Sequence, residues 1–337
     1  DDPTPWWSGD YVAKMLREWL HALVMTNTIA GHPMRIRLRE RLVAACDAGD
    51  ARLVREREGA AARRAARTPE EIEEERERVE RNHALFTAIG HGGRERRQRP
   101  EVPQEITDDT VLELLALLGP DLGDDGERIL RRVAADAPWH FAPAVEEVLT
   151  GRALASYGQG LLADLTEAYY LDEEDDGGSG LMDDGIRNHH TRGLITPLHA
   201  WYRGPFMPLF QTDLRRGVAV LNRMLNHAAL VRAHTLAGLH GPWGQVSEEE
   251  ADQYKTELRV TGEPRIYAGD DHVWMWYRGT GVGPYPCMSA LAALEIVCDQ
   301  YIAGGASLPN LIALLLDGCE NLAMLGLVVG ILVRHIE

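Results

Sequence analysis

Apolar residues recur at helical spacing over most of this chain. In residues 11–48 they stand three or four positions apart, as in Val12, Leu16 and Leu20, and the pattern breaks once near Gly31 and Pro33. This spacing predicts two helices. Further apolar stripes, most of them ended by Gly or Pro, predict helices over residues 107–118, 124–135, 144–149, 153–171 and 211–239, and a last apolar helix near the end of the chain.

Two stretches depart from this apolar pattern. Residues 51–83 are rich in Arg, Glu and Ala, and Thr68, Pro69 and Glu71 supply a capping hydroxyl, a first-turn proline and an acid that complements the helix dipole. A long exposed helix is predicted to begin there. Residues 91–106 combine Arg and Pro without an apolar period, which is typical of a linker. The chain therefore divides into an N-terminal helical region (1–90), a linker (91–106) and a second helical domain (107–337).

One segment of the second domain favours strands. Residues 256–260 alternate and residues 273–277 cluster in a β-favouring way around the turn residue Gly262, so we predict a hairpin near 256–278 in which these two segments pair. After it, a helix is predicted to begin near Met288, with Ser289 as its candidate cap. The predicted fold is mostly all-α: an irregular helical-repeat or α-solenoid-like array with one small β-hairpin, although the sequence has no fixed repeat period.

Composition and charge narrow the classes of partner and compartment. The 337 residues, 45% hydrophobic and 26% charged, are typical of a globular protein. A formal charge of -17 repels phosphate backbones and anionic lipid, so neither nucleic acid nor a membrane is the expected partner. The four cysteines are far apart and without a C-x-x-C pair, which indicates a reduced, cytoplasmic protein. The missing initial Met and the uncapped apolar end lead us to expect a segment of a longer protein.

Two loops superficially match ligand-binding motifs. Residues 279–283 are glycine-rich, but no Gly-Lys-Ser/Thr follows and the spacing differs from G-x-G-x-x-G, so we interpret them as a structural turn. Residues 172–183 resemble a calcium loop in their acidic positions, but Ser179 replaces the expected apolar residue and Asp183 the final Glu. We interpret this segment as a solvated loop.

Histidines and acids around residues 172–199 carry the alternative functional hypothesis, a helical metal-dependent enzyme. His189, His190 and His199 lie close in sequence to acidic residues and could supply metal ligands or acid–base groups. No H-E-x-x-H spacing is present, and the lack of a G-x-S-x-G elbow argues against a Ser–His–Asp triad. We therefore assign no catalytic, cofactor-binding or metal-binding residue, and no cofactor.

Aromatic residues supply the candidate binding surface. Five of them lie near glycines and prolines, where an exposed cluster would dock a protein partner. These candidate partner-binding residues are Trp201, Tyr202, Trp274, Trp276 and Tyr277.

Two passages carry a family resemblance. Residues 139–146 (WHFAPAVE), together with 276–279 (WYRG) and 286–291 (PCMSAL), resemble the helical region downstream of the nucleotide-binding module in large bacterial STAND-type ATP-binding proteins. The P-loop that defines this family is absent from the sequence. The resemblance implies a sensor, oligomerisation or scaffold region of a signalling or antiphage protein, with ATP hydrolysis performed elsewhere. Our first hypothesis is therefore a non-catalytic helical scaffold region that binds a protein partner or self-associates.

Overall fold

A computed structural model gives the structure of the chain. It describes residues 10–27, 30–68, several positions between 71 and 81, and residues 101–158, 160–171, 184–190, 197–240, 251–260 and 262–335. These residues are mostly helical, and their strands form one two-stranded antiparallel sheet. The predicted fold class, mostly all-α with one small β-hairpin, is confirmed.

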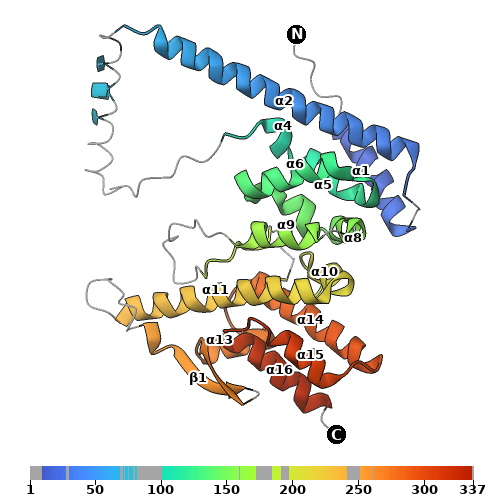
Figure 1. Cartoon of the computed structure of the whole chain (residues 1–337), viewed down its shortest axis with the longest axis vertical. Helices are drawn as coiled ribbons and strands as arrows, with labels where there is room; N and C mark the ends of the chain where they lie inside the picture. Colours follow the sequence, from blue (N-terminus) through green and yellow to red (C-terminus); the bar gives the residue numbers. More distant parts are fainter. Residues whose placement is uncertain are drawn as a thin grey trace.

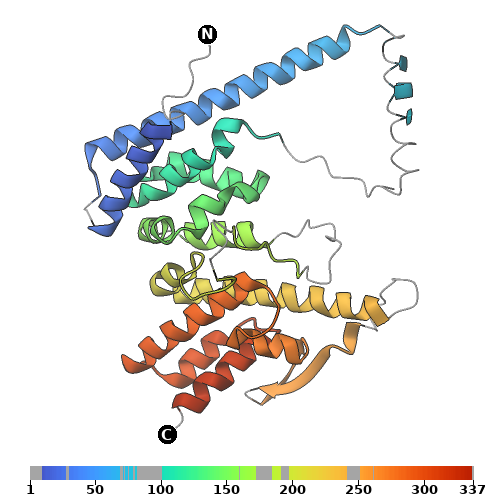
Figure 2. The same cartoon turned by 180° about the vertical axis from the view of Figure 1, so that it is seen from behind.

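Most helices belong to two layers, and within each layer the helices are stacked one after another along the long axis of the molecule (Figure 1). One layer contains α2 (Pro33–Ala65), α6 (Gly123–Asp136), α9 (Leu161–Tyr170) and α11 (Leu214–His240), each in contact with the next. The other layer, seen best from behind in Figure 2, contains α1 (Asp10–Met25), α5 (Asp109–Leu117), α8 (Val148–Tyr157), α10 (Phe206–Thr212) and α14 (Tyr285–Ala303). The two layers contact each other where α8 packs on α9 and where α11 packs on α10 and α14.

The remaining elements complete the fold. The end of the molecule opposite α2 is closed by α13 (Asp271–Met275), α15 (Leu308–Leu315) and α16 (Leu322–His335). Helix α16 packs with α11, α13, α14 and α15. Between the long helices lie α4 (Gln104–Thr107), α7 (Ala142–Glu146) and the 3-10 turns η1 (Gly119–Asp121), η2 (Pro138–Phe141) and η4 (Trp276–Arg278). One continuous buried cluster runs from Leu20 in α1 to Ile331 in α16, so both predicted helical regions contribute to the same core. Within the described residues, no helix is long and apolar enough to cross a membrane.

Local capping signals fix several helix starts as predicted. The Asp108 carboxylate accepts hydrogen bonds from the backbone N–H groups of Thr110 (2.8 Å) and Val111 (3.3 Å) at the start of α5. Thr68 and Glu71 form a reciprocal capping box, in which the Thr68 hydroxyl accepts from the Glu71 N–H at 3.3 Å and the Glu71 carboxylate accepts from the Thr68 N–H at 2.9 Å. The described positions from 71 to 81 are helical, as the sequence predicts.

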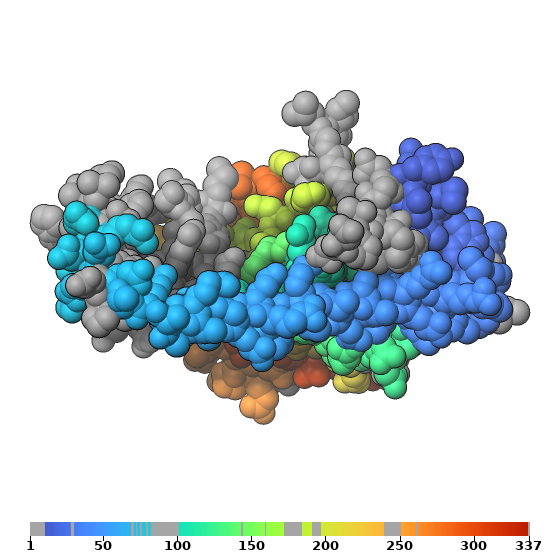
Figure 3. Space-filling model, turned by 90° about the horizontal axis from the view of Figure 1, so that it is seen from above, coloured from blue at the N-terminus to red at the C-terminus, as the bar shows by residue number. Residues whose placement is uncertain are grey.

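Helix α2 changes character along its length. Its buried residues lie between Arg35 and Gly49, and beyond Asp50 most of its side chains are exposed. This second half crosses one end of the molecule as a long rod (Figure 3). Two of its arginines reach α4 and the residues just before it. Arg52 pairs with Glu105 of α4 at 2.6 Å, and Arg57 pairs with Glu101 at 3.2 Å.

The hairpin exists, but its second strand was predicted wrongly. Strand β1 (Lys255–Val260) pairs with β2 (Glu263–Ala268), so that Val260 faces Glu263 across a turn at Gly262, whose φ of 92° favours glycine. The predicted partner, residues 273–277, forms α13 and η4 instead. The reason is a local cap that the sequence analysis overlooked, because the Asp270 carboxylate accepts the Val273 N–H at 3.0 Å and starts a helix.

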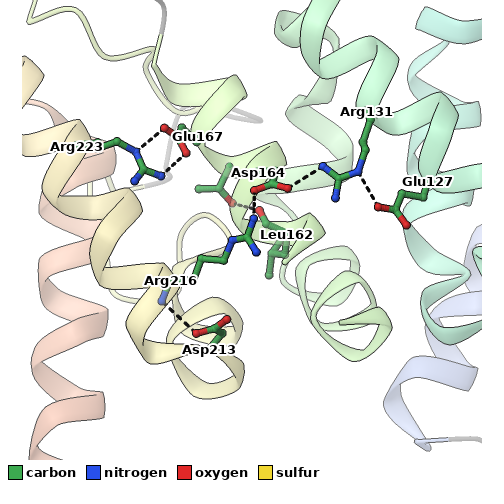
Figure 4. A network of polar contacts seen from close by, with 9 residues as sticks. Glu127, Arg131, Leu162, Asp164, Glu167, Asp213, Arg216 and Arg223 are labelled. Carbon is green, nitrogen blue, oxygen red and sulfur yellow. Dashed lines mark hydrogen bonds and ion pairs between the residues drawn. The ribbon is translucent and has the colours of Figure 1, made fainter. Parts of the chain in front are cut away.

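Arginine–carboxylate pairs cross the seams between helices of the α2–α11 layer. Arg131 of α6 and Arg216 of α11 both bind Asp164 of α9, at 2.7 and 2.5 Å, and Arg223 of α11 pairs with Glu167 of α9 (Figure 4). Comparable pairs cross the neighbouring seams, namely Arg132 with Asp50 and Arg232 with Asp270. Because these side chains are partly exposed, each pair contributes little stability, about 1 kcal/mol or less. Together they fix how the helices are aligned.

Candidate functional site

The five predicted partner-binding aromatics do not share one surface. Trp201 and Tyr202 are 48% and 45% exposed, with ring centroids 5.5 Å apart in a T-shaped arrangement. Trp274 and Tyr277 are half-buried. Trp276 is only 1% exposed and packs in the core, so it is removed from the candidate surface. Partner binding by the other four remains a prediction.

Trp201 and Tyr202 belong to a braced surface segment, residues 197–202, which we call the aromatic segment. Leu198 is also exposed. The buried guanidinium of Arg203 donates to the carbonyl oxygens of Pro197 (2.6 Å) and Leu198 (3.2 Å), which closes the segment on itself. The backbone N–H of Ala200 donates to Ser289 Oγ of α14 at 3.2 Å. Apolar and aromatic groups are thus presented to solvent on a backbone held from below.

A groove of about 480 Å³ opens beside this segment. His199 lines it together with η4 and with the faces of α14 and α16 that carry Met288, Val329 and Val333. Its shape depends on glycine in α16, because a Cβ at Gly326 would stand 2.6 Å from the Tyr277 ring. Glycine there allows Tyr277 to lie directly against α16 at the edge of the groove.

The charges around the groove are unevenly paired. Arg334 binds Glu295 at 2.6 Å and Asp299 at 3.2 Å. Arg278, in contrast, is exposed and donates to the Tyr277 hydroxyl at 2.8 Å, and among the described residues no carboxylate is recorded as its ion-pair partner. The groove therefore combines apolar walls with one guanidinium left to solvent.

A buried polar relay lies beneath the aromatic segment. His189 Nδ1 is 3.4 Å from Glu146 Oε1 of α7, and its Nε2 is 3.0 Å from Ser289 Oγ of α14. The Tyr170 hydroxyl of α9 donates to Glu146 Oε1 at 3.3 Å, and the backbone N–H of His190 donates to Glu146 Oε2 at 2.8 Å. We refer to Glu146, His189 and Ser289 as the relay. It joins helices from the middle of the molecule to α14.

Burial sets the electrostatics of the relay. Desolvation lowers the pKa of His189 below its usual value near 6.5, and the neighbouring Glu146 opposes this shift. The same burial raises the pKa of Tyr170 well above 10. The imidazole is therefore neutral at pH 7. With Glu146 Oε1 beside Nδ1, the tautomer that carries its proton on Nδ1 leaves Nε2 to accept the proton of the Ser289 hydroxyl.

The relay has the order of a Ser–His–acid triad, which the sequence analysis had set aside for want of an elbow motif. Its surroundings differ from those of a hydrolase. Ser289 is wholly buried inside the first turns of α14, rather than capping that helix as predicted, and its Oγ already accepts the Ala200 N–H. The arrangement therefore serves as a hydrogen-bonded support of the aromatic segment. No sequence signal points to it, since the three residues are far apart along the chain.

The metal hypothesis finds no cluster in the described part of the chain. No group of three His, Cys, Asp or Glu side chains there could hold a metal ion. Both ring nitrogens of His189 have partners within the relay, and the ring of His199 stacks on Tyr285 with centroids 6.3 Å apart. The acidic segment 172–183 lies outside the described residues. The glycine-rich residues 279–283 connect η4 to α14.

No family model matches the chain, and no curated protein shows significant similarity to it. The resemblance to STAND-type proteins therefore stays a prediction.

Proposed function

We propose that this chain is a non-catalytic helical interaction region that docks a protein partner on the aromatic segment, residues 197–202. The observation that carries the proposal is the pair Trp201 and Tyr202, each about half exposed and held on a braced backbone. Tryptophan and tyrosine are enriched among the residues that dominate binding energy at protein interfaces. A backbone already fixed in place loses less conformational freedom on binding, so affinity is gained.

The relay supports the same proposal. It lies below the aromatic segment and reaches it through Ser289, whose hydroxyl accepts the N–H of Ala200. A polar network that would suit catalysis if it were open to substrate is here closed and used in packing. The implied resemblance to a sensor or scaffold region of a bacterial protein points the same way.

The proposal is tested by co-purification from cells that make this protein. Trp201→Ala combined with Tyr202→Ala removes the exposed rings, and Tyr301→Ala on α14, also well exposed, is the matched control. We expect wild type and the control to retain the same associated protein and the double variant to lose it, with the melting temperatures unchanged. Equal retention by all three proteins would overturn the proposal.

A further inference from the structure

Helices α1 and α16 lie toward opposite ends of the molecule (Figure 1), and each carries exposed apolar side chains. At one end, the outer face of α1 presents Tyr11, Met15 and Met25, of which Tyr11 is 78% and Met15 57% exposed. These positions, with Ala22 between them, fall on one side of the helix. We call this the α1 face. At the other end lies the groove, where Val333 of α16 is 76% exposed.

The two faces are complementary in charge as well as in polarity. Glu18 stands in the middle of the α1 face, exposed and with no recorded ion pair among the described residues. The groove carries Arg278, which is likewise exposed and without an ion pair among the described residues, beside Met288, Val329 and Val333. Glu295, which also lines the groove, is already paired with Arg334 at 2.6 Å, so the charge complementarity rests on Glu18 and Arg278. An amphipathic helix laid into an apolar groove is a recurrent mode of recognition.

We infer that the groove takes the α1 face of a second copy of this chain, with Met15 against Val329 and Val333 and with Glu18 paired to Arg278. Large exposed apolar faces on a helix indicate a contact surface, and methionine adapts well to an irregular groove. Because the two faces differ, the contact is head-to-tail, and each added copy leaves one α1 face and one groove free. The inference goes beyond the proposed function. The groove borders the aromatic segment at His199, but its lining does not include Trp201 or Tyr202.

Sedimentation velocity over a range of protein concentrations measures the self-association that the inference predicts. Met15→Asp disables the α1 face and Val333→Asp the groove, and both side chains are exposed, so the fold is expected to survive. Wild type should form species larger than a dimer as its concentration rises, whereas each variant alone should stay monomeric. An equimolar mixture of the two variants should form a heterodimer and nothing larger, because one intact α1 face and one intact groove remain. Val54→Asp, on the exposed second half of α2, is the control and should behave as wild type.

Charge exchange sharpens this test. Glu18→Arg and Arg278→Glu should each weaken association by at least about tenfold, and the two changes in one chain should restore it. A wild-type chain that stays monomeric throughout, or a mixture of the two Asp variants that does not associate, would overturn the inference. Loss of a partner in the Trp201/Tyr202 variant would still stand in that case, so the two proposals can fail separately.

Discussion

Two polar systems connect helices in this molecule, and they differ in their contact with water. The arginine pairs of Figure 4 cross the α6–α9 and α9–α11 seams at the surface, where solvent and salt screen them. The relay runs from the half-buried Glu146 to His189 and Ser289 in the interior, where a donor without an acceptor cannot turn to water. The shorter distances are found in the surface system, yet we expect the longer, buried contacts to contribute more stability. Burial, rather than distance, decides the contribution.

The largest effect is expected from Glu146→Ala. This change removes the acceptor shared by the Tyr170 hydroxyl, the His189 ring and the exposed His190 N–H, while Tyr170 and His189 Nδ1 keep each other as partners at 3.2 Å. The free energy of unfolding should fall by about 2–3 kcal/mol. Urea unfolding of the purified chain measures it. Glu146→Gln keeps one acceptor oxygen and should lie between wild type and Ala. A loss below about 0.5 kcal/mol for Ala would show that the relay is not a support.

Ser289→Ala should lower the free energy of unfolding by less, about 1–2 kcal/mol, because it removes one hydroxyl that serves both His189 and Ala200.

Labelling of Ser289 distinguishes a supporting role of the relay from a catalytic one. A fluorophosphonate probe is expected to leave Ser289 unmodified in the folded chain, as seen by mass spectrometry of the digested protein. Stoichiometric labelling of Ser289 would instead assign it a nucleophilic role.

The pH dependence of stability should reveal His189. Its pKa is lower in the folded than in the unfolded chain, so below pH 6.5 the unfolded state binds the proton first. Its contribution to stability is therefore full above about pH 6.5 and is lost as the pH falls toward the folded pKa, by at most about 1.4 kcal/mol per pH unit. Urea unfolding at pH 7.5 and pH 5.5 should show a larger drop for wild type than for His189→Gln. Equal drops would contradict the assignment.

The smallest loss of stability is expected when a partly exposed arginine pair is removed. Arg131→Ala removes the pairs with Glu127 and Asp164 and should lower the free energy of unfolding by less than about 1 kcal/mol. The loss should shrink further at high ionic strength, because the side chains are partly exposed. A loss as large as that of Glu146→Ala would reverse the comparison between the two systems.

Helix starts that depend on a local cap could be predicted from the sequence, whereas contacts between distant segments could not. The acids and hydroxyls at Asp108 and Thr68 act within three residues, so their caps could be predicted. The Asp270 cap is equally local, but the β-favouring side chains of residues 273–277 predicted a strand there instead of a helix. Which aromatics are exposed depends on packing between distant segments, so Trp276 and Trp201 could not be told apart. For the same reason the relay, built from α7, residues 184–190 and α14, left no pattern to detect.

The most direct test of the interaction role is a photo-crosslinking amino acid placed at Tyr202 of this protein inside its own cells. Position 202 lies on the aromatic segment, and position 54 on the exposed half of α2 provides the control. We predict one discrete crosslinked protein at position 202, lost when Trp201 is also changed to Ala, and none at position 54. No crosslink at position 202, or the same products at both positions, would contradict the proposal that the aromatic segment docks a partner.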